Sequence, residues 1–578
     1  MKRCLMALAL LLIFVSCRTA DERAAEALAR RVMGAKASAV KFEQIQSQTD
    51  MYELAQDGKK VLIRGNNANS MAVGLNRYIQ EYCLANVSWY HYNPVQLPEV
   101  MPAVPQKVTA TAQLNERFFL NYCTFGYTMP WWKWEQWERF IDWMALNGVN
   151  MPLAITGQEA VWQRVWRKYG LTDEQIRSYF TGPAHLPWHR MCNIDGWQGP
   201  LPQSWIDGQA ELQKRILGRE RELNMRPVLP AFSGHIPAAL KEVVDRPLKT
   251  SPVSAWGRFA EKYRCTYLNP TDSLFACIQK DFMEEQLRMY GTDHIYGVDP
   301  FNEVAPPSVE PSDLAAMSKG IFESLTAVDP DAIWLQMGWL FISNQRRWTP
   351  ERIEAYLTAV PQGRMIILDY ESDYIEVWRH TEKCYGQKFI WCYLGNFGGM
   401  TGIEGDFHLN ADRIAAAKEE GGPGFVGIGS TLEGFGVNEP VYEAVLSQAW
   451  DTGVSFDQYI DNIADRHLGR VDSIYRAFWH YMVENAYVTH TSNSSSSVIC
   501  CHPNLEGIWN GTTVYERGYD PAEMEKALEM DKEKFLRLKK SEIIPFIEEE
   551  LATRYWFQEA GIQVRLRYDR QLKDALAR

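Results

Sequence analysis

Residues 291–308 read GTDHIYGVDPFNEVAPPS, and this stretch indicates how the chain folds. A glycine ends an amphipathic helix, the apolar segment 295–298 follows, and Asn302 and Glu303 then enter a loop that two prolines close. An apolar strand that ends in a carboxylate and rigid turn residues is typical of α/β barrels, which present catalytic groups at the carboxyl ends of their strands. Taken alone, the stretch fits a solvated glutamate at a strand end equally well.

Eight apolar strand candidates surround this stretch, and helical segments such as 133–147 and 272–290 alternate with them. The strand candidates lie at 117–125, 149–155, 226–232, 294–301, 333–339, 364–370, 388–394 and 424–430. Nearly continuous apolar runs of this kind are typical of parallel strands that are buried on both faces. The pattern predicts an α/β fold built on a (β/α)8 barrel. A doubly wound open sheet is the competing fold, but no glycine fingerprint follows the first strand.

Two further regions flank the predicted barrel, which we assign to residues 111–452. Residues 21–110 predict a small α/β domain with a helix at 22–32, three strands, a second helix and a proline-rich linker. After residue 452 the pattern becomes helical and charged, so 453–578 are expected to form an α-helical C-terminal domain. A chain of 578 residues is too long for one core, which agrees with a division into several domains.

Residues 1–17 have the composition of a bacterial signal peptide. A basic start precedes an apolar run that is too short to span a bilayer, and Ser16-Cys17 follows directly. This order resembles a lipoprotein signal in which Cys17 becomes the lipidated N-terminus, although Phe14 stands where leucine is more usual. We therefore expect an exported protein, periplasmic or on the outer membrane, whose membrane contact is limited to an N-terminal lipid anchor. Cleavage without lipidation is the alternative.

The charge and the cysteine pattern argue against several classes of partner. A net charge of −12 without a basic run argues against binding of nucleic acid. Nine cysteines remain after the signal peptide, and their odd number and irregular spacing do not form a disulfide framework. Cys123 and Cys392 are expected to be reduced. The run Cys500-Cys501-His502 lacks the spacing of a zinc site, and we expect neither a metal nor a cofactor.

A second carboxylate, Glu433, follows the strand candidate at 424–430. It lies among glycines, which allow close approach of backbone and ligand. The strand count places Glu303 after strand four and Glu433 after strand eight, across the barrel from each other. Two strand-end glutamates on one barrel face indicate glycoside hydrolysis, in which one protonates the leaving oxygen and the other attacks the anomeric carbon or activates water. Other carboxylates near loop ends are Asp299, Asp369, Glu404 and Glu439.

Successive motifs of the chain resemble those of the α-N-acetylglucosaminidases, glycoside hydrolase family 89. The matching segments are RFFLNYCTFGYTMPWWKWEQWERFIDWMALNGVN, TGQEAVWQRVW, FTGPAHLPWHRM, PVLPAFSGHIP, GTDHIYGVDPFNEVAPPS, MGWLF, FIWCYLGNFGG and GIGSTLEGFGVNEPVYE. The resemblance implies a small α/β domain, a (β/α)8 barrel and a helical C-terminal domain. It also implies that the helical domain here is shorter than in the family.

The resemblance also implies roles for individual residues. Glu303 matches the general acid/base of the family, and Glu433 matches its nucleophile. Asn121 and Cys123, which we place on the first strand, match residues that line the substrate pocket. Further substrate-binding positions implied by the resemblance are Trp188, His235, Asn302, Trp339 and Asn396.

The implied activity is exo-acting, retaining hydrolysis of terminal α-linked N-acetylglucosamine from glycans. In an α-glycoside the 2-acetamido group lies on the same face as the leaving group, so it cannot attack from behind and the protein must supply the nucleophile. Such a reaction needs two carboxyl groups about 5–5.5 Å apart. One alternative is a non-catalytic glycan-binding lipoprotein on the cell surface. The other is a different exo-hexosaminidase, such as a β-hexosaminidase, which would need an adjacent Asp-Glu pair, whereas Asp299 precedes Glu303 by four residues.

Overall fold

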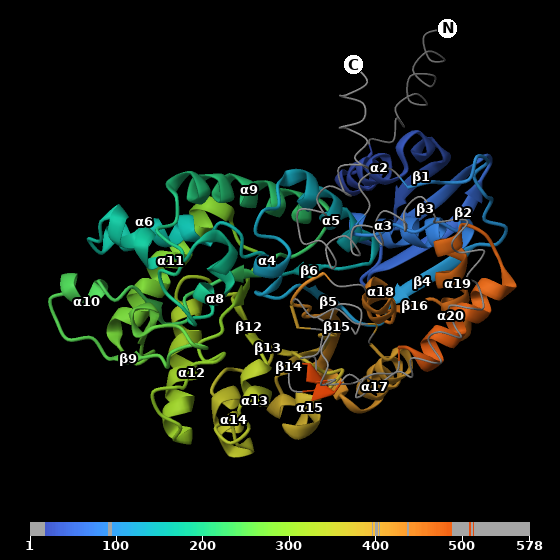
Figure 1. The fold of residues 1–578 in the computed structure, drawn as a ribbon. Helices are drawn as coiled ribbons and strands as arrows, with labels where there is room; N and C mark the ends of the chain where they lie inside the picture. The colour runs from blue at the N-terminus through green and yellow to red at the C-terminus, as the bar shows by residue number, and fades with distance from the viewer. Residues whose placement is uncertain are drawn as a thin grey trace, which may run out of the picture.

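The computed structural model describes residues 18–487, except 91–94, 396, 399–402, 404 and 436–437, and the backbone of 508–509 and 512–513. The predicted signal peptide and the predicted helices after residue 488 therefore lie outside the described residues. Three parts follow one another along the described chain: an N-terminal sheet with its helices, a ring of parallel strands surrounded by helices, and a pair of helices (Figure 1).

The N-terminal part is a five-stranded sheet packed against two helices. Its strand order is β1-β3-β2-β4-β16, in which β1 and β3 are parallel and the other neighbours are antiparallel. The strands are β1 (Val40–Gln44), β2 (Met51–Asp57), β3 (Lys60–Gly65), β4 (Val108–Ala112) and β16 (Trp450–Asp451). The helices are α2 (Ala20–Met33) and α3 (Ala68–Arg77), with the short elements η1 (Gly34–Ala39) and η2 (Tyr78–Tyr82). Because β16 follows the barrel in sequence, the chain returns to the N-terminal sheet after completing the ring.

Eight parallel strands form the central sheet, in the order β6-β5-β15-β14-β13-β12-β11-β7. They are β5 (Glu116–Phe119), β6 (Met151–Pro152), β7 (Leu229–Pro230), β11 (Ile295–Gly297), β12 (Ile333–Met337), β13 (Met365–Asp369), β14 (Lys388–Tyr393) and β15 (Phe425–Ser430). Each lies within one residue of, or inside, a predicted strand. The predicted α/β barrel class is thus confirmed, although several strands are shorter than expected.

The two edge strands of this sheet, β6 and β7, meet and curl it into a ring. Leu153 and Val228 form a parallel bridge. The Ala154 N–H donates to the Val228 carbonyl at 2.9 Å, and the Val228 N–H donates to the Pro152 carbonyl at 2.8 Å. Because all eight strands run in one direction, their carboxyl ends lie on one face of the ring.

Helices between the strands surround the ring (Figure 1). The longer ones are α5 (Trp134–Leu146), α6 (Gln158–Lys168), α9 (Gln203–Glu222), α11 (Ser273–Tyr290), α12 (Pro311–Thr326), α14 (Pro350–Thr358), α17 (Phe407–Glu420) and α18 (Glu439–Ser447). Short elements are α4 (Thr124–Tyr127), α13 (Trp339–Ser343), α15 (Val377–His380), α16 (Glu382–Tyr385) and η5 (Gly422–Gly424). The Asp272 side chain caps α11 by accepting from the Leu274 N–H, and Gly291 ends the helix with φ of 75°. The opening glycine of the 291–308 stretch thus ends a helix, as predicted.

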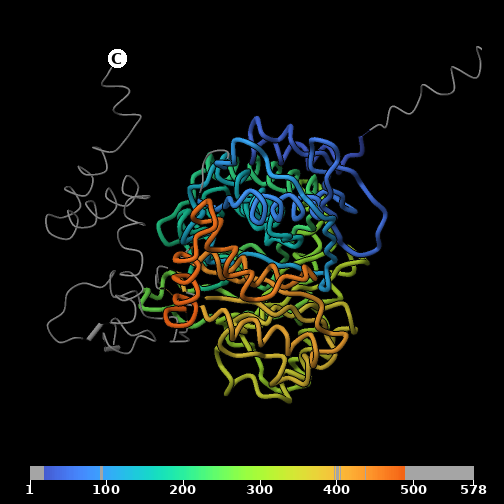
Figure 2. Tube along the Cα trace, turned by 90° about the vertical axis from the view of Figure 1, so that its right-hand side faces the viewer, coloured from blue at the N-terminus to red at the C-terminus, as the bar shows by residue number. Residues whose placement is uncertain are grey.

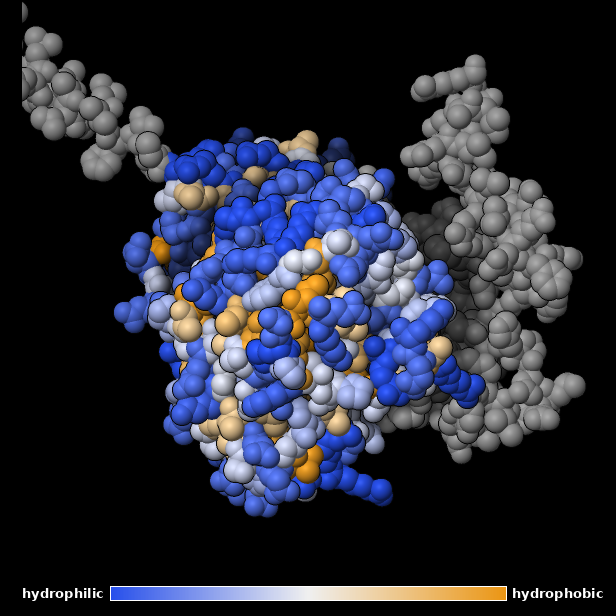
Figure 3. Space-filling model, turned by 90° about the vertical axis from the view of Figure 1, so that its left-hand side faces the viewer, coloured by the Kyte–Doolittle hydropathy of each residue, from blue (hydrophilic) through white to orange (hydrophobic). Residues whose placement is uncertain are grey.

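Two insertions extend the face at the carboxyl ends of the strands. The first lies between α6 and α9 and contains α7 (Asp173–Tyr179), η3 (Pro183–His185) and α8 (Leu186–Arg190). The second follows β7 and forms a three-stranded antiparallel sheet in the order β8-β10-β9. Its elements are β8 (His235–Ile236), α10 (Leu240–Val243), β9 (Thr250–Pro252), η4 (Glu261–Tyr263) and β10 (Thr266–Leu268). Figure 3 shows the left-hand side of Figure 1, where α6, α10 and β9 lie. The surface there is mostly hydrophilic, with a small apolar area near its middle.

The prediction that Asn121 and Cys123 lie on the first strand is wrong. The predicted strand 117–125 is four residues long in the structure, because Leu120 turns the backbone out of the extended region with φ of 90°. Asn121 and Cys123 then form a turn that leads into α4. Apolar character continues through this turn, since both residues are buried, and it therefore resembles a longer strand in the sequence.

Helices α19 (Phe456–Leu468) and α20 (Ser473–Asn485) follow the barrel, as predicted for the helical region. Asn462 donates to the carbonyl of Gln80 in the N-terminal part at 2.9 Å, which ties α19 to that part. In Figure 2 these helices lie between the N-terminal part and the later barrel strands. In the described part of the chain, no helix is long and apolar enough to cross a membrane.

Candidate active site

Glu303 and Glu433 leave the same face of the ring, in the loops after β11 and β15. The buried thiol of Cys123 lies within electrostatic reach of both. Burial raises the pKa of this thiol well above its usual value, and the negative charges of Glu433 and Glu303 raise it further. Strands four and eight are opposite in the ring, so their loops bring the two carboxylates toward each other over the barrel mouth.

The Glu433 carboxylate is largely enclosed by protein. Its Oε2 accepts a hydrogen bond from the backbone N–H of Gly398 at 2.8 Å, and the Cys123 thiol also bonds to it. Burial raises the pKa of Glu433, the charge of Glu303 adds to this rise, and the two hydrogen bonds oppose it. The negative charge of Glu433 is therefore costly to bury, and two hydrogen-bond donors offset part of that cost.

Glu303 is exposed, and two side chains from the insertions hold one of its oxygens. Asn193 Nδ2 and Trp256 Nε1 each donate to Glu303 Oε2 at 2.9 Å. Neither residue was predicted from the sequence. Asn193 lies in the 172–203 segment, whose length and content of Trp, His, Pro and Gly predict a functional loop. Trp256 lies in a segment whose sequence shows no comparable signal.

Asn121 braces the loop that carries Glu433. Its Nδ2 donates to the Thr431 carbonyl at 2.7 Å, and its Oδ1 accepts from the Cys123 N–H at 3.0 Å. The neighbouring Thr124 hydroxyl donates to the Leu432 carbonyl at 2.5 Å. The turn after β5 is therefore joined to the loop after β15, and the Asn121 side chain bonds protein on both of its polar atoms.

Aromatic rings stand near the glutamates. The Trp188 ring lies edge-on to Tyr127 at 5.1 Å between centroids and lies 6.2 Å from the Trp256 ring. Trp339, at the start of α13, lies 6.0 Å from Phe397 in an edge arrangement. Partly exposed rings of this kind suit the apolar faces of sugar rings.

Asn302 lies beside Glu303 but is buried, with its Nδ2 3.2 Å from the sulfur of Met191. It therefore links the loop after β11 to the first insertion. Asn396 lies outside the described residues.

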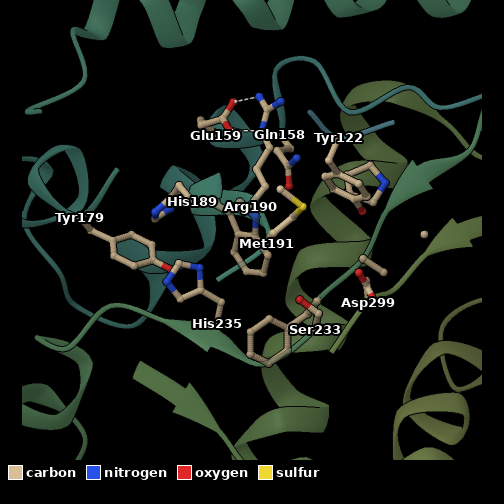
Figure 4. Close-up of a pocket in the computed structure, with 15 residues that line it drawn as sticks. Tyr122, Gln158, Glu159, Tyr179, His189, Arg190, Met191, Ser233, His235 and Asp299 are labelled. Carbon is tan, nitrogen blue, oxygen red and sulfur yellow. Dashed lines mark hydrogen bonds and ion pairs between the residues drawn. The ribbon is translucent and has the colours of Figure 1, made fainter. Parts of the chain in front are cut away.

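His235 faces a small neighbouring cavity of about 30 Å³, room for one or two water molecules. Its Nε2 lies 2.7 Å from Asp195 Oδ1. The labelled residues in Figure 4 surround this cavity, and Asp299 lines it from the barrel side. Burial raises the pKa of Asp299 to about 7, and the charge of Glu303 contributes to this rise. Neither glutamate lines this cavity, so His235 is set apart from the other predicted residues.

A parallel eight-stranded barrel that brings two glutamates together above its carboxyl ends, among partly exposed aromatic rings, has the construction of a carbohydrate-processing barrel protein. Residues 117–452 match the family model described as the alpha-N-acetylglucosaminidase (NAGLU) tim-barrel domain, and residues 23–103 match the N-terminal domain model of the same family. The chain belongs to the alpha-N-acetylglucosaminidase family, as its motifs predicted. Residues 512–577 match a model described as the C-terminal helical domain of a probable PDZ-protease.

Known proteins that resemble this chain support the assignment to this family. Human alpha-N-acetylglucosaminidase is 41% identical over 442 residues, which are 76% of this chain and 59% of the human protein. A family 89 glycoside hydrolase of Clostridium perfringens, solved with 2-acetamido-1,2-dideoxynojirmycin, is 28% identical with a TM-score of 0.82, covering 93% of this chain and 61% of that chain. A variant of the Clostridium enzyme with two Glu→Gln substitutions was solved with its substrate GlcNAc-alpha-1,4-galactose. The chain thus spans about three fifths of the length of these relatives.

Proposed function

We propose that this chain is an exo-acting, retaining α-N-acetylglucosaminidase that removes terminal α-linked N-acetylglucosamine from glycans. The observation that carries the proposal is the pair Glu303 and Glu433 above one barrel mouth, close enough for the charge of one to raise the pKa of the other. Membership of the family and the substrate complex of the Clostridium relative support the same substrate class.

The stereochemistry of the substrate sets the role of Glu433. The acetamido group of an α-linked sugar cannot reach the anomeric carbon from behind, so a carboxylate of the protein must form the covalent intermediate. Glu433 suits this task because the Gly398 N–H and the Cys123 thiol hold it in place as an anion. Its pKa is raised, so activity is expected to rise as the pH rises through a range above that of an ordinary carboxyl group.

Glu303 is the proposed acid and base. It is the more exposed of the two, and the Asn193 and Trp256 donors fix one oxygen, while the other has no hydrogen bond to the described part of the chain and can face the leaving group. A proton on Glu303 removes its negative charge and so lowers the cost of ionising Glu433. A retaining mechanism requires the proton on Glu303 and the negative charge on Glu433 when the substrate binds.

Exo action is supported by the segments that stand around the pair. The first insertion contributes Trp188 and Asn193, and the second contributes Trp256, so one side of the glutamate pair is walled by protein. A wall on this side leaves less room for a glycan that continues beyond the bound sugar.

Hydrolysis of p-nitrophenyl α- and β-N-acetylglucosaminide tests the proposal. We expect turnover of the α-anomer, and proton NMR should record the α-anomer of the sugar as the first product. Turnover of the β-anomer alone would favour a β-hexosaminidase, and binding without turnover would favour a glycan-binding protein.

Two substitutions test the roles of the glutamates. Glu433→Ala should abolish turnover, and added azide should restore it with formation of a glycosyl azide. Glu303→Ala should slow substrates with poor leaving groups far more than activated aryl glycosides. Glu310→Ala is the matched control, at an exposed glutamate farther along the loop after β11. It should leave the turnover of both kinds of substrate unchanged. Equal losses on both kinds of substrate would contradict the role of Glu303.

We also propose that the chain is exported and carries a lipid on Cys17. The basic start, the short apolar run and Ser16-Cys17 support this proposal. Mass spectrometry of the protein purified from membranes should find a lipidated N-terminal cysteine, and Cys17→Ala should release the protein from the membrane fraction. A non-lipidated N-terminus would favour simple cleavage.

A further inference from the structure

Four side chains gather behind the wall that holds Glu303, and we call them the Cys-His-Asp cluster: Cys192, Asp195, His235 and Cys265. The ligand atoms of Cys192, His235 and Cys265 all lie within 4.8 Å of one another, and these three residues are buried. Asp195 Oδ1 lies 2.7 Å from His235 Nε2 and 3.4 Å from Cys265 Sγ.

The cluster joins three segments that are distant in sequence. Cys192 and Asp195 lie in the loop after α8, His235 lies on β8, and Cys265 immediately precedes β10. The antiparallel pairing of β8 with β10 places Tyr267 opposite His235, which brings the histidine close to Cys265. Cys192 has φ of 61°, a left-handed conformation that costs energy in a residue with a side chain. This strained conformation is retained at a buried cysteine of the cluster.

We propose that the Cys-His-Asp cluster binds a divalent metal ion of the zinc type. Its protein ligands are the thiolates of Cys192 and Cys265 and one ring nitrogen of His235. Two thiolates and one imidazole supply three positions of a tetrahedral zinc shell, and water supplies the fourth. Asp195, which lies 2.7 Å from His235 Nε2, orients the histidine from outside this shell. This assignment replaces the expectation from the sequence that the chain holds no metal.

The three ligand atoms are close enough for such a shell. With bonds of about 2.3 Å to sulfur and about 2.0–2.1 Å to nitrogen, tetrahedral angles place a sulfur and a nitrogen ligand about 3.5 Å apart and two sulfur ligands about 3.8 Å apart. The ligand atoms of Cys192, His235 and Cys265 lie within 4.8 Å of one another, so they need to close by about 1 Å at most around an ion.

Residues around the cluster fit the surroundings of a metal. His189 Nδ1 lies 3.2 Å from Asp195 Oδ1, where it supports the carboxylate that bonds the ligand His235. The Tyr179 ring covers both histidines, with centroids 4.5 Å from His189 and 5.0 Å from His235. Both cysteines are free thiols, so both sulfurs are available to bind a metal.

A metal here would fix the parts of the chain that contact Glu303. Asn193 directly follows the ligand Cys192 and donates to Glu303. Trp256, the second donor to Glu303, lies in the segment between β9 and the ligand Cys265. This consequence rests on the proposed function, whereas the metal site itself does not.

Metal analysis of the full chain, purified without a histidine tag, tests the proposal. Inductively coupled plasma mass spectrometry should find about one zinc ion per chain. Cys192→Ser and Cys265→Ser should each lose most of it. Cys277→Ser makes the same change at an exposed cysteine outside the cluster and should keep the metal. Wild-type protein refolded with Co²⁺ should show a thiolate-to-cobalt charge-transfer band that Cys192→Ser lacks.

The same experiments can overturn the proposal. Wild-type protein that contains no more metal than the two serine variants would exclude the site, as would a Cys192–Cys265 disulfide in a non-reducing peptide map. Because a serine variant could fail to fold, a chelator titration of the wild-type protein supplies a second measurement. Chelation should lower the midpoint of thermal unfolding, and added Zn²⁺ should restore it; an unchanged midpoint counts against the site. None of these measurements depends on glycosidase activity.

Discussion

At the scale of single residues, the candidate site depends on how each glutamate is held. Glu433 is enclosed, so its charge is costly, and among the described residues the Gly398 N–H and the Cys123 thiol offset that cost. Glu303 is exposed, so its position depends on the Asn193 and Trp256 donors. Similar carboxylates at the ends of two strands thus acquire different properties from their surroundings.

Glu433→Gln should stabilise the folded protein at neutral pH. The folded state raises the pKa of this carboxyl, so folding disfavours its charged form, and wild-type stability falls as the pH rises above about 4.5. Glutamine does not titrate. The free energy of unfolding of Glu433→Gln should therefore equal that of the wild type near pH 4 and exceed it by on the order of 1 kcal/mol at pH 7. Urea unfolding at both pH values measures this difference. An equal advantage at both values would show that the charge is not its cause.

Trp256→Phe should weaken the acid function while keeping a ring in place. It removes one of the two donors to Glu303, and a hydrogen bond to a charged group contributes about 1.5–3 kcal/mol. We therefore expect kcat/KM on a natural disaccharide to fall about 10- to 100-fold, with a smaller loss on an activated aryl glycoside. Trp197→Phe, at a ring that packs on Phe259 and Tyr263, is the control and should change neither value.

At the scale of elements, strand β5 is anchored by a buried arginine. Arg117 donates to the Gly148 carbonyl at 2.5 Å and to the Leu114 carbonyl at 3.1 Å, and it pairs with Asp50 of the N-terminal part at 2.5 Å. Its side chain is fully buried, so the pairing supplies the compensation that a charge inside protein requires. One residue therefore joins the first barrel strand to the N-terminal sheet.

Arg117→Met should destabilise the protein by about 3–5 kcal/mol, because it leaves Asp50 without its cation. Burial would raise the pKa of Asp50, but the charge and hydrogen bonds of Arg117 outweigh it and lower that pKa. The stabilisation is therefore present at neutral pH and is lost as the pH falls below about 4. Denaturant unfolding measures the loss. Arg226→Met removes a half-exposed pair with Glu116 and should cost less than about 1 kcal/mol.

At the scale of the whole molecule, one buried group of charges joins all three parts. Glu439 at the start of α18 accepts from the Ser88 hydroxyl at 2.5 Å and the Trp89 N–H at 2.8 Å, both in the N-terminal part. One turn later on α18, Glu443 pairs with Arg466 of α19 at 2.5 Å. Burial raises the pKa of both glutamates, and the charge of Arg466 opposes this rise.

Arg466→Leu should destabilise the protein more at high pH than at low pH. Without the cation, the pKa values of Glu439 and Glu443 rise further, so ionising them costs more stability as the pH increases. We expect a loss of about 3–5 kcal/mol at pH 8 and a clearly smaller loss at pH 5, measured by denaturant unfolding. Arg470→Leu removes an exposed arginine just after α19 and is the matched control. A loss independent of pH would indicate a packing defect instead.

Much of the fold could be predicted from the sequence, because strands buried on both faces and amphipathic helices leave local patterns. The eight barrel strands and the positions of Glu303 and Glu433 after strands four and eight were predicted correctly. The first strand was predicted too long, because Leu120 leaves the extended conformation while the apolar pattern continues. Strand β4 was not predicted, and it pairs with β2 about 60 positions earlier in the chain. The return of β16 to the N-terminal sheet depends on pairing with β4, more than 300 positions earlier.

The sequence by itself determined the elements, the ring they form and the two glutamates, because these follow from periodicity, turn residues and family motifs. Only the tertiary structure decided what surrounds the glutamates. Asn193 is 110 residues from Glu303, Trp256 is 47 residues away, and the Cys-His-Asp cluster draws on three segments. The physical reason is that closing the barrel brings distant loops to one face, and contacts between such loops leave no local pattern in the sequence.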